Sequence, residues 1–431
     1  MTDLLAARSQ MAMSLGFHII FAIMGIGMPL LMILAEYFYL KTNDLTYLTL
    51  AKRWAKGTAI MFVVGAVSGT ALSFELGLLW PGFMRFAGPI IGMPFSLEGF
   101  AFFLEAIFLG IYFYGWDKVS PKAHWFAGIM VFVTGSLSGI FVICANAWMN
   151  TPVGFTLENG VVTHFDPWVA MFNPAAFSET FHMTLAAYVS VGFAAAGVHA
   201  MALLKNPNNA FHQKGLMIAF CVGAFFIPIQ LFSGHISAEH VAKYQPIKLA
   251  AMEGQWDTQR GAPLRILGWP NEKLEKTEYA IEIPYMLSFL AYENFDAEVR
   301  GIKSFPADER PPIWPIHVGF QVMVMAGMAM LGMAFFGAMF LWKRRRWFFH
   351  PRFLKLLVCA SPLGFIAVEA GWMVTEIGRQ PWIVFHVMRT ADAITPMPHL
   401  QIPFIAFSAL YFILGVVVIY LLRKRVLHVD A

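Results

Sequence analysis

Nine apolar stretches dominate the chain and restrict what it can fold into. Each is about 20 residues long or longer, the length that a helix needs to cross the hydrocarbon core of a bilayer. Charged residues make up 13% of the chain, about half of the share that is usual in soluble proteins. We therefore expect an all-α integral membrane protein, a bundle of about nine transmembrane helices. The expected spans cover residues 11–38, 58–79, 95–115, 124–148, 177–203, 215–234, 316–341, 354–377 and 400–422.

The expected spans leave one long extramembrane segment. Six spans lie in residues 1–234 and three in residues 316–431, and the polar residues 235–315 between them are numerous enough for a structure of their own. The first apolar stretch is too long for the core of a signal peptide and lacks a small-residue cleavage site, so we expect it to be the first span. The sequence thus divides into six spans, one loop and three spans.

Other classes of protein fit the composition poorly. The formal net charge of +4 is too small to suggest a nucleic-acid partner. The three cysteines, Cys144, Cys221 and Cys359, lie in apolar runs without CxxC spacing. They therefore predict neither a disulfide framework nor a zinc site.

The distribution of Lys and Arg predicts the orientation of the bundle. The connections after the first, third, fifth and seventh spans, together with the C-terminal tail, hold seventeen of the 30 basic residues. The short connections on the other side hold only Arg85, Arg379 and Arg389. Because basic connections stay in the cytoplasm, we expect the N-terminus outside, the C-terminus in the cytoplasm and the loop 235–315 on the outer face.

Five side chains from different predicted spans lie at similar depth in the outer half of the membrane. An ionisable group inside a span is costly, so it marks a functional site by default. Imidazole, thioether and carboxyl groups are ligands for haem iron rather than for hard cations, and a helix bundle can hold such a cofactor between facing helices. The five are His18, Glu98, His182, Met323 and Glu376.

Two pairs of acids repeat at a spacing of seven residues, which places each pair on one face of a helix. Glu98 and Glu105 form the first pair and Glu369 and Glu376 the second. Buried acids have no packing use, so Glu98 and Glu105 are candidates for proton relays, cation sites or iron ligands.

Several similar residues have simpler interpretations. Histidines near span ends are expected to be hydrogen-bonded at the membrane interface; they are His124, His212, His350, His386 and His399. Among 26 methionines, any single one is more commonly a core residue. From the residues alone, Met325 or His317 would serve as well as Met323.

Four long strings carry a resemblance to a known family. They are "SLEGFAFFLEAIF" at 96–108, "ANAWMNTPVGF" at 145–155, "QPIKLAAMEGQWDTQ" at 245–259 and "EAGWMVTEIGRQPW" at 369–382. They closely resemble subunit I of the cytochrome bd quinol oxidases, and the resemblance runs from "MSLGFHIIF" to the last span. Residues 235–315 contain no extended insertion, so the chain is similar to the short-loop branch.

The resemblance implies roles for the buried residues. His182 and Met323 resemble the axial ligands of a low-spin haem b. His18 and Glu376 resemble ligands of two high-spin haems, b and d, although the resemblance does not say which haem belongs to which ligand. Glu98 resembles an acid of the di-haem site.

The same resemblance extends to residues around the haems. Glu105 resembles the inner member of a proton route, and Trp372 an aromatic ring packed between haems. Arg379 resembles a partner of the haem propionates. Lys248 and Glu253 match residues of quinol oxidation in the outer loop, which makes 235–315 the expected quinol-binding segment.

One departure from the family concerns Gln321, because some members have Arg at this position, two residues before Met323. The positive field on the low-spin haem is then expected to differ, and with it the reduction potential.

The implied function is that of a terminal oxidase in the bacterial cytoplasmic (inner) membrane. It would oxidise quinol at the outer face, reduce O2 to water with cytoplasmic protons and generate a membrane potential without a pump. The implied partners are subunit II, a small single-helix subunit, quinol and the lipid bilayer. Two alternatives stay open here: an ion-coupled secondary transporter, and a haem b electron-transfer anchor without O2 chemistry. The residues do not choose between ubiquinol and menaquinol.

Overall fold

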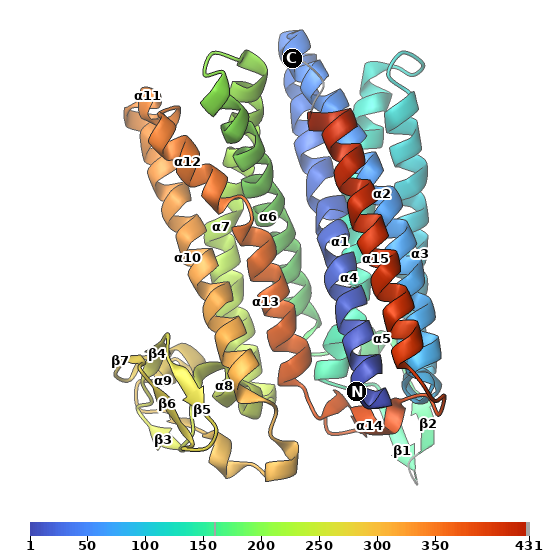
Figure 1. Ribbon diagram of the computed structural model, residues 1–431, viewed down its shortest axis with the longest axis vertical. Coiled ribbons are helices and arrows are strands. Elements are labelled where there is room, and N and C mark those ends of the chain that lie inside the picture. The colour runs from blue at the N-terminus through green and yellow to red at the C-terminus, as the bar shows by residue number, and fades with distance from the viewer. Residues whose placement is uncertain (159–160, 428–431) are drawn as a thin grey trace.

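The computed structural model describes residues 1–158 and 161–427. Within these residues, nine helical segments are long and apolar enough to cross a membrane, which confirms the predicted fold class. The N-terminus and the C-terminal end of the chain lie at opposite ends of the bundle (Figure 1). The nine are α1 (Asp3–Thr42), α2 (Leu45–Leu79), α3 (Pro81–Tyr114), α4 (Pro121–Asn150), α6 (Ala176–Lys205), α7 (Ala210–Tyr244), α10 (Ile313–Lys343), α12 with α13 (Pro351–Gly378), and α15 (Gln401–Leu422) with the η3 turn that follows it.

The helices continue well beyond the apolar stretches that predict them. α1 has 40 residues and α7 has 35, whereas about 20 residues suffice to cross the hydrocarbon core. Polar side chains at a helix end meet headgroups and water, so they do not stop the backbone from remaining helical. As a result, the first ten residues of the predicted outer loop, 235–244, belong to α7.

The eighth span is interrupted, which the sequence prediction did not include. α12 (Pro351–Ala360) ends before Ser361 and Pro362, and α13 (Leu363–Gly378) begins directly after them. Proline disfavours the helical conformation of the residue before it and cannot donate a backbone hydrogen bond. The break leaves α13 as a short helix that carries the second pair of acids.

The helices pack in pairs that form two adjoining groups. α1 packs along α2 and α3 along α4; α6 packs along α7 and α10 along α13. In Figure 1, α10, α12, α7, α6 and α13 stand on one side, and α1 to α4 with α15 on the other. α1 and α4 both contact α6, and α13 contacts α1. The candidate residues are divided between the groups: His182, Met323 and Glu376 lie on helices of the group that contains α6 and α13, and His18, Glu98 and Glu105 on helices of the other.

The segment between α7 and α10 folds into short helices and two-stranded sheets at the end of the bundle that carries the N-terminus (Figure 1). Three antiparallel pairs form in it: β3 with β8, β4 with β7 and β5 with β6. Its elements are α8 (Pro246–Glu253), β3 (Gln259–Arg260), β4 (Leu264–Ile266), β5 (Trp269–Asn271), β6 (Lys276–Glu278), β7 (Ile281–Ile283), α9 (Met286–Tyr292), β8 (Glu298–Val299), η1 (Ile302–Ser304) and η2 (Ala307–Glu309).

The remaining elements are short connections. β1 pairs with β2 and β9 pairs with β10, each in an antiparallel two-stranded sheet. They are β1 (Phe155–Glu158), β2 (Val161–Phe165), α5 (Pro167–Met171), α11 (Arg345–Phe348), β9 (Trp382–Val384), β10 (Met388–Arg389), α14 (Thr390–Ala393) and η3 (Arg423–Leu427).

Candidate functional site

His182 and Met323 lie in the group formed by α6, α7, α10 and α13. The Nδ1 atom of His182 lies 2.9 Å from the hydroxyl of Ser233 on α7, and this contact fixes the orientation of the ring. The amide nitrogen of Gln230 lies 3.2 Å from the other ring nitrogen, Nε2. The Ser233 contact is of the kind that orients a ligating histidine through the nitrogen that does not meet the metal, whereas the Gln230 amide lies within hydrogen-bond distance of the nitrogen that would.

Met323 fits closely against α13 because a glycine faces it. A Cβ atom built on Gly371 would lie 3.0 Å from the Met323 sulfur. A residue larger than glycine at position 371 would therefore crowd the thioether of Met323. This contact favours Met323 as the residue for which α13 leaves room.

His18 is held in the same manner on the other side of the bundle. Its Nδ1 atom lies 3.0 Å from the hydroxyl of Ser68 on α2. A Cβ atom at Gly69 would come within 2.8 Å of the imidazole ring. The backbone carbonyl of Gly65, also on α2, is a second hydrogen-bond partner of the ring.

Glu376 and Arg379 form a tight pair at the end of α13. Arg379 Nη2 donates to one carboxyl oxygen of Glu376 at 2.6 Å, and Asn146 Nδ2 on α4 donates to the other at 2.7 Å. Arg379 is only 1% exposed. Its Nε atom is buried and has no hydrogen-bond partner among the residues that the structure describes.

Asn150 connects this pair to α8, in the segment between α7 and α10. Its Oδ1 atom accepts from Lys248 Nζ of α8 at 3.1 Å and from Arg379 Nη1 at 3.5 Å. Its Nδ2 atom donates to Glu179 of α6 at 2.9 Å. One amide thus joins four helices, and the charges of Lys248 and Arg379 are balanced by Glu179 and Glu376.

Lys248 and Glu253 are both buried in α8 but face different surroundings, as their spacing of five residues dictates. Burial lowers the pKa of Lys248 to about 7, although the Glu179 carboxyl opposes the shift. Burial raises the pKa of Glu253 to about 8, against the effect of Arg265. Within residues 1–158 and 161–427, the Oε2 atom of Glu253 has no hydrogen-bond partner. Lys248 and Glu253 therefore lie on different faces of α8.

The acids of α3 lie between α3, α4 and α1. Ser138 of α4 donates to Glu98 at 3.4 Å. Glu105 is 5% exposed, and its carboxyl faces Gly135 of α4 and Gly25 of α1. In the described part of the chain, its Oε1 atom has no hydrogen-bond partner.

Two further residues of α13, Trp372 and Glu369, contact other parts of the bundle. Trp372 is partly buried and packs against the main hydrophobic core. Glu369 reaches α1, where a Cβ atom at Gly16 would lie 3.2 Å from its carboxyl oxygen. Since Gly16 is two residues from His18, the two acids of α13 face the region where both helix groups meet.

Gln321 connects α10 to the segment that precedes it. It accepts from the backbone of Leu267 at 2.9 Å and donates to the carbonyl of Arg265 at 3.0 Å. A cavity of about 300 Å³ opens beside the start of α8, between Ile247, Arg300 and Trp382. Neither Lys248 nor Glu253 lines this cavity.

Several buried polar residues were missed by the sequence analysis. Glu36 and Glu75 are 2% and 1% exposed, and each is a single acid in apolar helical text, which was a usable signal. Glu179, which stands three residues before His182, is a further buried acid that the sequence analysis overlooked. Asn146 and Asn150 are neutral and end a span, so their sequence context does not distinguish them from ordinary interfacial residues.

Comparison with known proteins decides the family. The family model for the cytochrome bd terminal oxidase subunit I matches residues 6–429. The chain belongs to this family. The bd oxidase subunit I fold is also that of the bd oxidase from Geobacillus thermodenitrificans, with a TM-score of 0.94, 39% identity and 98% of each chain covered.

Curated relatives agree with this bd oxidase assignment. A putative cytochrome bd menaquinol oxidase subunit I of Bacillus subtilis is 38% identical, over 98% of this chain and 96% of the relative. A cytochrome bd ubiquinol oxidase subunit 1 of the same species is 34% identical, over 99% and 94%. The cytochrome bd-II ubiquinol oxidase subunit 1 of Escherichia coli is 27% identical, over 97% and 95%.

Membership confirms the class of protein that the sequence predicts. The chain is a multi-pass subunit of a bacterial cytoplasmic-membrane terminal oxidase, a haem-dependent quinol oxidase that works with a subunit II. The two alternatives, a secondary transporter and a haem b anchor, are therefore wrong. The names of the relatives differ in the quinol, so ubiquinol and menaquinol stay open.

Proposed function

We propose that this subunit oxidises quinol in the outer segment 235–315 and delivers the electrons to an O2-reducing haem site in the outer half of the bundle. The observation that carries the proposal is the buried connection from Lys248 through Asn150 to Arg379 and Glu376. A buried chain of charges is costly to maintain. The cost is justified here because the chain joins Lys248, which we assign to quinol, to Glu376, which we assign to iron.

The side chains fit the haems that the family uses. His182 and Met323 would hold a low-spin haem b, and His18 and Glu376 would hold the two high-spin haems, b and d, with Glu98 beside them. The unpartnered Nε atom of Arg379 supports a haem propionate as its missing acceptor, because a buried guanidinium needs its donors satisfied. Trp372 would pack against these groups. The haem irons supply one-electron transfer and a place for O2 to bind.

Quinol oxidation requires a group that accepts a hydroxyl proton, and Glu253 is suited to this role. Its Oε2 atom has no competing hydrogen-bond donor, and burial raises its pKa to about 8, close to the operating pH that favours a general base. Each quinol releases two protons and two electrons. Lys248 would hold the quinol oxygen while its own charge is balanced by Glu179.

The protons consumed in water formation would pass through Glu105 to Glu98. These carboxyls share one face of α3, and Glu105 has a free, buried oxygen from which a proton can be handed on. We assign the end of the bundle that carries the N-terminus to the outer face, as the Lys and Arg distribution predicts. Protons taken from the cytoplasm and released outside would then create a membrane potential without a pump. A small single-helix subunit remains part of the proposed assembly.

A pyridine haemochrome spectrum of the purified enzyme tests the haem assignment. We expect haem b together with a chlorin-type haem, and we expect His182→Ala to remove only the low-spin haem b. Material that kept its full visible absorption after separate replacement of His18, His182 and Glu376 by Ala would refute the ligand set.

A further inference from the structure

His317, near the start of α10, is enclosed between two stretches of backbone. Its Nδ1 atom lies 2.8 Å from the carbonyl oxygen of Met252, and its Nε2 atom lies 3.0 Å from that of Leu267. The side chain is 0% exposed. Within residues 1–158 and 161–427, no carboxyl group is hydrogen-bonded to the ring. Both ring nitrogens therefore face oxygen atoms that can only accept.

This geometry is that of a doubly protonated ring. A neutral imidazole carries one N–H group, so its other nitrogen would place a lone pair against a carbonyl oxygen. An imidazolium donates to both carbonyls. Burial and the charge of Arg265 oppose the charged ring, whereas the two acceptors and the negative end of the helix to which Met252 belongs favour it.

A second buried histidine shows what distinguishes His317. His124 of α4 contacts the Glu36 carboxyl through Nδ1 at 2.7 Å and the Tyr112 carbonyl through Nε2 at 2.8 Å. One of these partners is an acid, which can hold the shared proton itself. Neither partner of His317 can do so, and the second proton has to stay on the ring.

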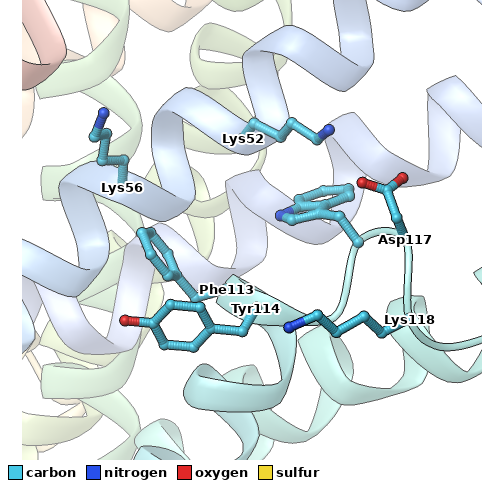
Figure 2. A pocket seen from close by; sticks show the side chains of 7 residues that line it. Lys52, Lys56, Phe113, Tyr114, Asp117 and Lys118 are labelled. Atoms are coloured by element: carbon cyan, nitrogen blue, oxygen red, sulfur yellow. The ribbon is translucent and has the colours of Figure 1, made fainter.

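The surroundings of the two rings differ as well. The Trp116 ring lies 4.0 Å from the His124 ring and lines a cavity of about 370 Å³ at the end of α3. Figure 2 shows Lys52 of α2 and Lys118 at this cavity. His317 lines neither this cavity nor the one beside α8. The two carbonyls, rather than a cavity, are therefore the polar surroundings of its ring.

The Met252 carbonyl belongs to the last turn of α8, where carbonyls lack partners within the helix. The backbone N–H of Gly254 bonds to two carbonyls of this turn, and the Thr277 hydroxyl donates to the Gly254 carbonyl at 2.8 Å. His317 meets the carbonyl that these contacts leave open. The end of α8 is thus capped by α10, directly beside Glu253.

The second carbonyl belongs to the turn between β4 and β5. Leu267 has a φ angle of 60°, a left-handed conformation that is unfavourable for a residue with a side chain. Gln321, one turn beyond His317 on α10, accepts from the backbone N–H of Leu267 at 2.9 Å. One face of α10 therefore holds both polar backbone groups of this turn as well as the end of α8.

Glu253 has charged groups on more than one side. Arg265 acts on its carboxyl and is itself paired with Glu282, through Nε at 2.9 Å. His317 lies close to the residues on both sides of Glu253. Because Arg265 and Glu282 balance each other, the charge of His317 is the one that balances an ionised Glu253.

We propose that His317 is the positioning residue of the base in quinol oxidation. As an imidazolium it caps the end of α8 that carries Glu253, and it favours the ionised carboxyl, which is the form that accepts a proton. The inference rests on the proposed function, in which Glu253 takes a hydroxyl proton from quinol. His317 keeps its own protons and acts through Glu253 rather than on the substrate.

Nuclear magnetic resonance of the complete two-subunit enzyme tests the charge directly. Histidine is isotope-labelled at the ring nitrogens and methionine at the carbonyl carbon, so that the contact with Met252 identifies the ring. We expect two protonated ring nitrogens at neutral pH, in a signal that is absent from His317→Gln. One protonated and one unprotonated nitrogen would overturn the proposal.

The pH profile of quinol oxidation tests the effect on Glu253. His317→Gln keeps an amide donor but carries no charge. We expect the rise of kcat/KM with pH to move upward by about one pH unit, which lowers kcat/KM about tenfold at neutral pH and leaves it nearly unchanged at high pH. His399→Gln, which alters an exposed histidine before α15, is the control and should keep the profile.

Thr277→Val separates the charge of His317 from its mechanical hold on α8. This variant removes a neutral donor from the Gly254 carbonyl, so kcat/KM should fall by the same factor at every pH. A profile of His317→Gln that falls in this uniform way would leave His317 as a structural cap only and overturn the proposal. If His317→Gln does not assemble with haem, the resonance measurement on the unmodified enzyme decides.

Glu253→Gln separates this inference from the function on which it rests. A normal profile in Glu253→Gln would overturn the assignment of the base. A flat profile in Glu253→Gln, together with an unshifted profile in His317→Gln, would overturn the role of His317 alone. The expected result is a flat profile in the first variant and a shifted profile in the second.

Discussion

Lys248 and Arg379 donate to the same atom, Oδ1 of Asn150, although one belongs to the outer segment and the other ends the helix that carries Glu376. Two cations that share one neutral acceptor repel each other unless acids are close. Glu179 and Glu376 meet this need, through Asn150 Nδ2 and Arg379 Nη2 respectively. The proposed quinol site and the proposed iron site are therefore parts of one electrostatic unit.

Replacing Asn150 by Leu should uncouple this unit. The substitution removes the shared acceptor and leaves two buried cations without it, which we expect to cost about 3 kcal/mol of stability and to lower kcat/KM for quinol by at least about tenfold. Thermal unfolding and a quinol oxidase assay measure the two effects. Asn206→Ala, at an exposed helix end, is the control and should change neither. Unaltered quinol kinetics in Asn150→Leu would show that the connection is only structural.

The pH dependence of quinol oxidation should report Glu253. A general base acts when ionised, and burial raises the pKa of this carboxyl to about 8. The ionised fraction therefore grows about tenfold for each pH unit below that value and levels off above it, so kcat/KM for quinol should rise with pH in the same way. We expect Glu253→Gln to lower kcat/KM by about 100-fold and to flatten the profile. Glu298→Gln, an exposed acid of the same segment, should leave the profile intact; a normal profile in Glu253→Gln would assign the base elsewhere.

Glu105→Leu should slow O2 reduction while it leaves the haem spectra largely intact. The carboxyl lies among α1, α3 and α4 and does not contact any of the proposed iron ligands in the described hydrogen bonds, so its loss should affect proton supply rather than haem binding. An oxygen electrode and visible spectroscopy measure the two properties. Glu105→Asp, which keeps a shorter acid, should retain partial activity. Full turnover in Glu105→Leu would refute the assignment.

Gly69→Ala should disturb the haem that His18 is proposed to hold. The new methyl group would lie 2.8 Å from the imidazole ring, and a ring packed against α2 cannot give way without losing its bond to Ser68. We expect loss or spectral change of a high-spin haem, measured by the difference spectrum of the reduced enzyme. Gly77→Ala is a matched control on the same helix, because a Cβ atom there meets nothing within 4 Å. Equal spectra for the two variants would remove His18 from the ligand set.

Residues whose polar side chains are costly inside a membrane were predictable from the sequence. Residues whose role depends on their neighbours in the folded chain were not. His18, Glu98 and Glu105 stand out as polar groups in apolar helices, and the spacing of seven residues already places both acids on one face. Asn150 does not stand out, because its importance comes from Lys248 and Arg379, which are distant in sequence. Only the tertiary packing brings Lys248 and Arg379 to Asn150.

The fold, too, was predictable from the sequence only in part. Apolar length predicts that nine helical segments cross the membrane, since hydrophobic cost is a local property of the sequence. It does not predict that α7 runs on to Tyr244 or that Pro362 divides the eighth span. The strand pairs of the outer segment were also not predicted, because strands of two or three residues are held by partners on other parts of the chain. Lys248 and Glu253 were grouped by the family motif, although their spacing of five residues already turns them apart.

The unbroken course of α7 gives the outer segment a mechanical connection to the lipid. This helix has 35 residues, about 52 Å of rod for a hydrocarbon core of about 30 Å, and only Gln245 separates it from α8. A change in its tilt in response to bilayer thickness would move α8 and Glu253, the proposed base of quinol oxidation, relative to the headgroups. Lipid chain length thereby becomes a variable of substrate access, and the same subunit would work at different rates in thin and thick membranes.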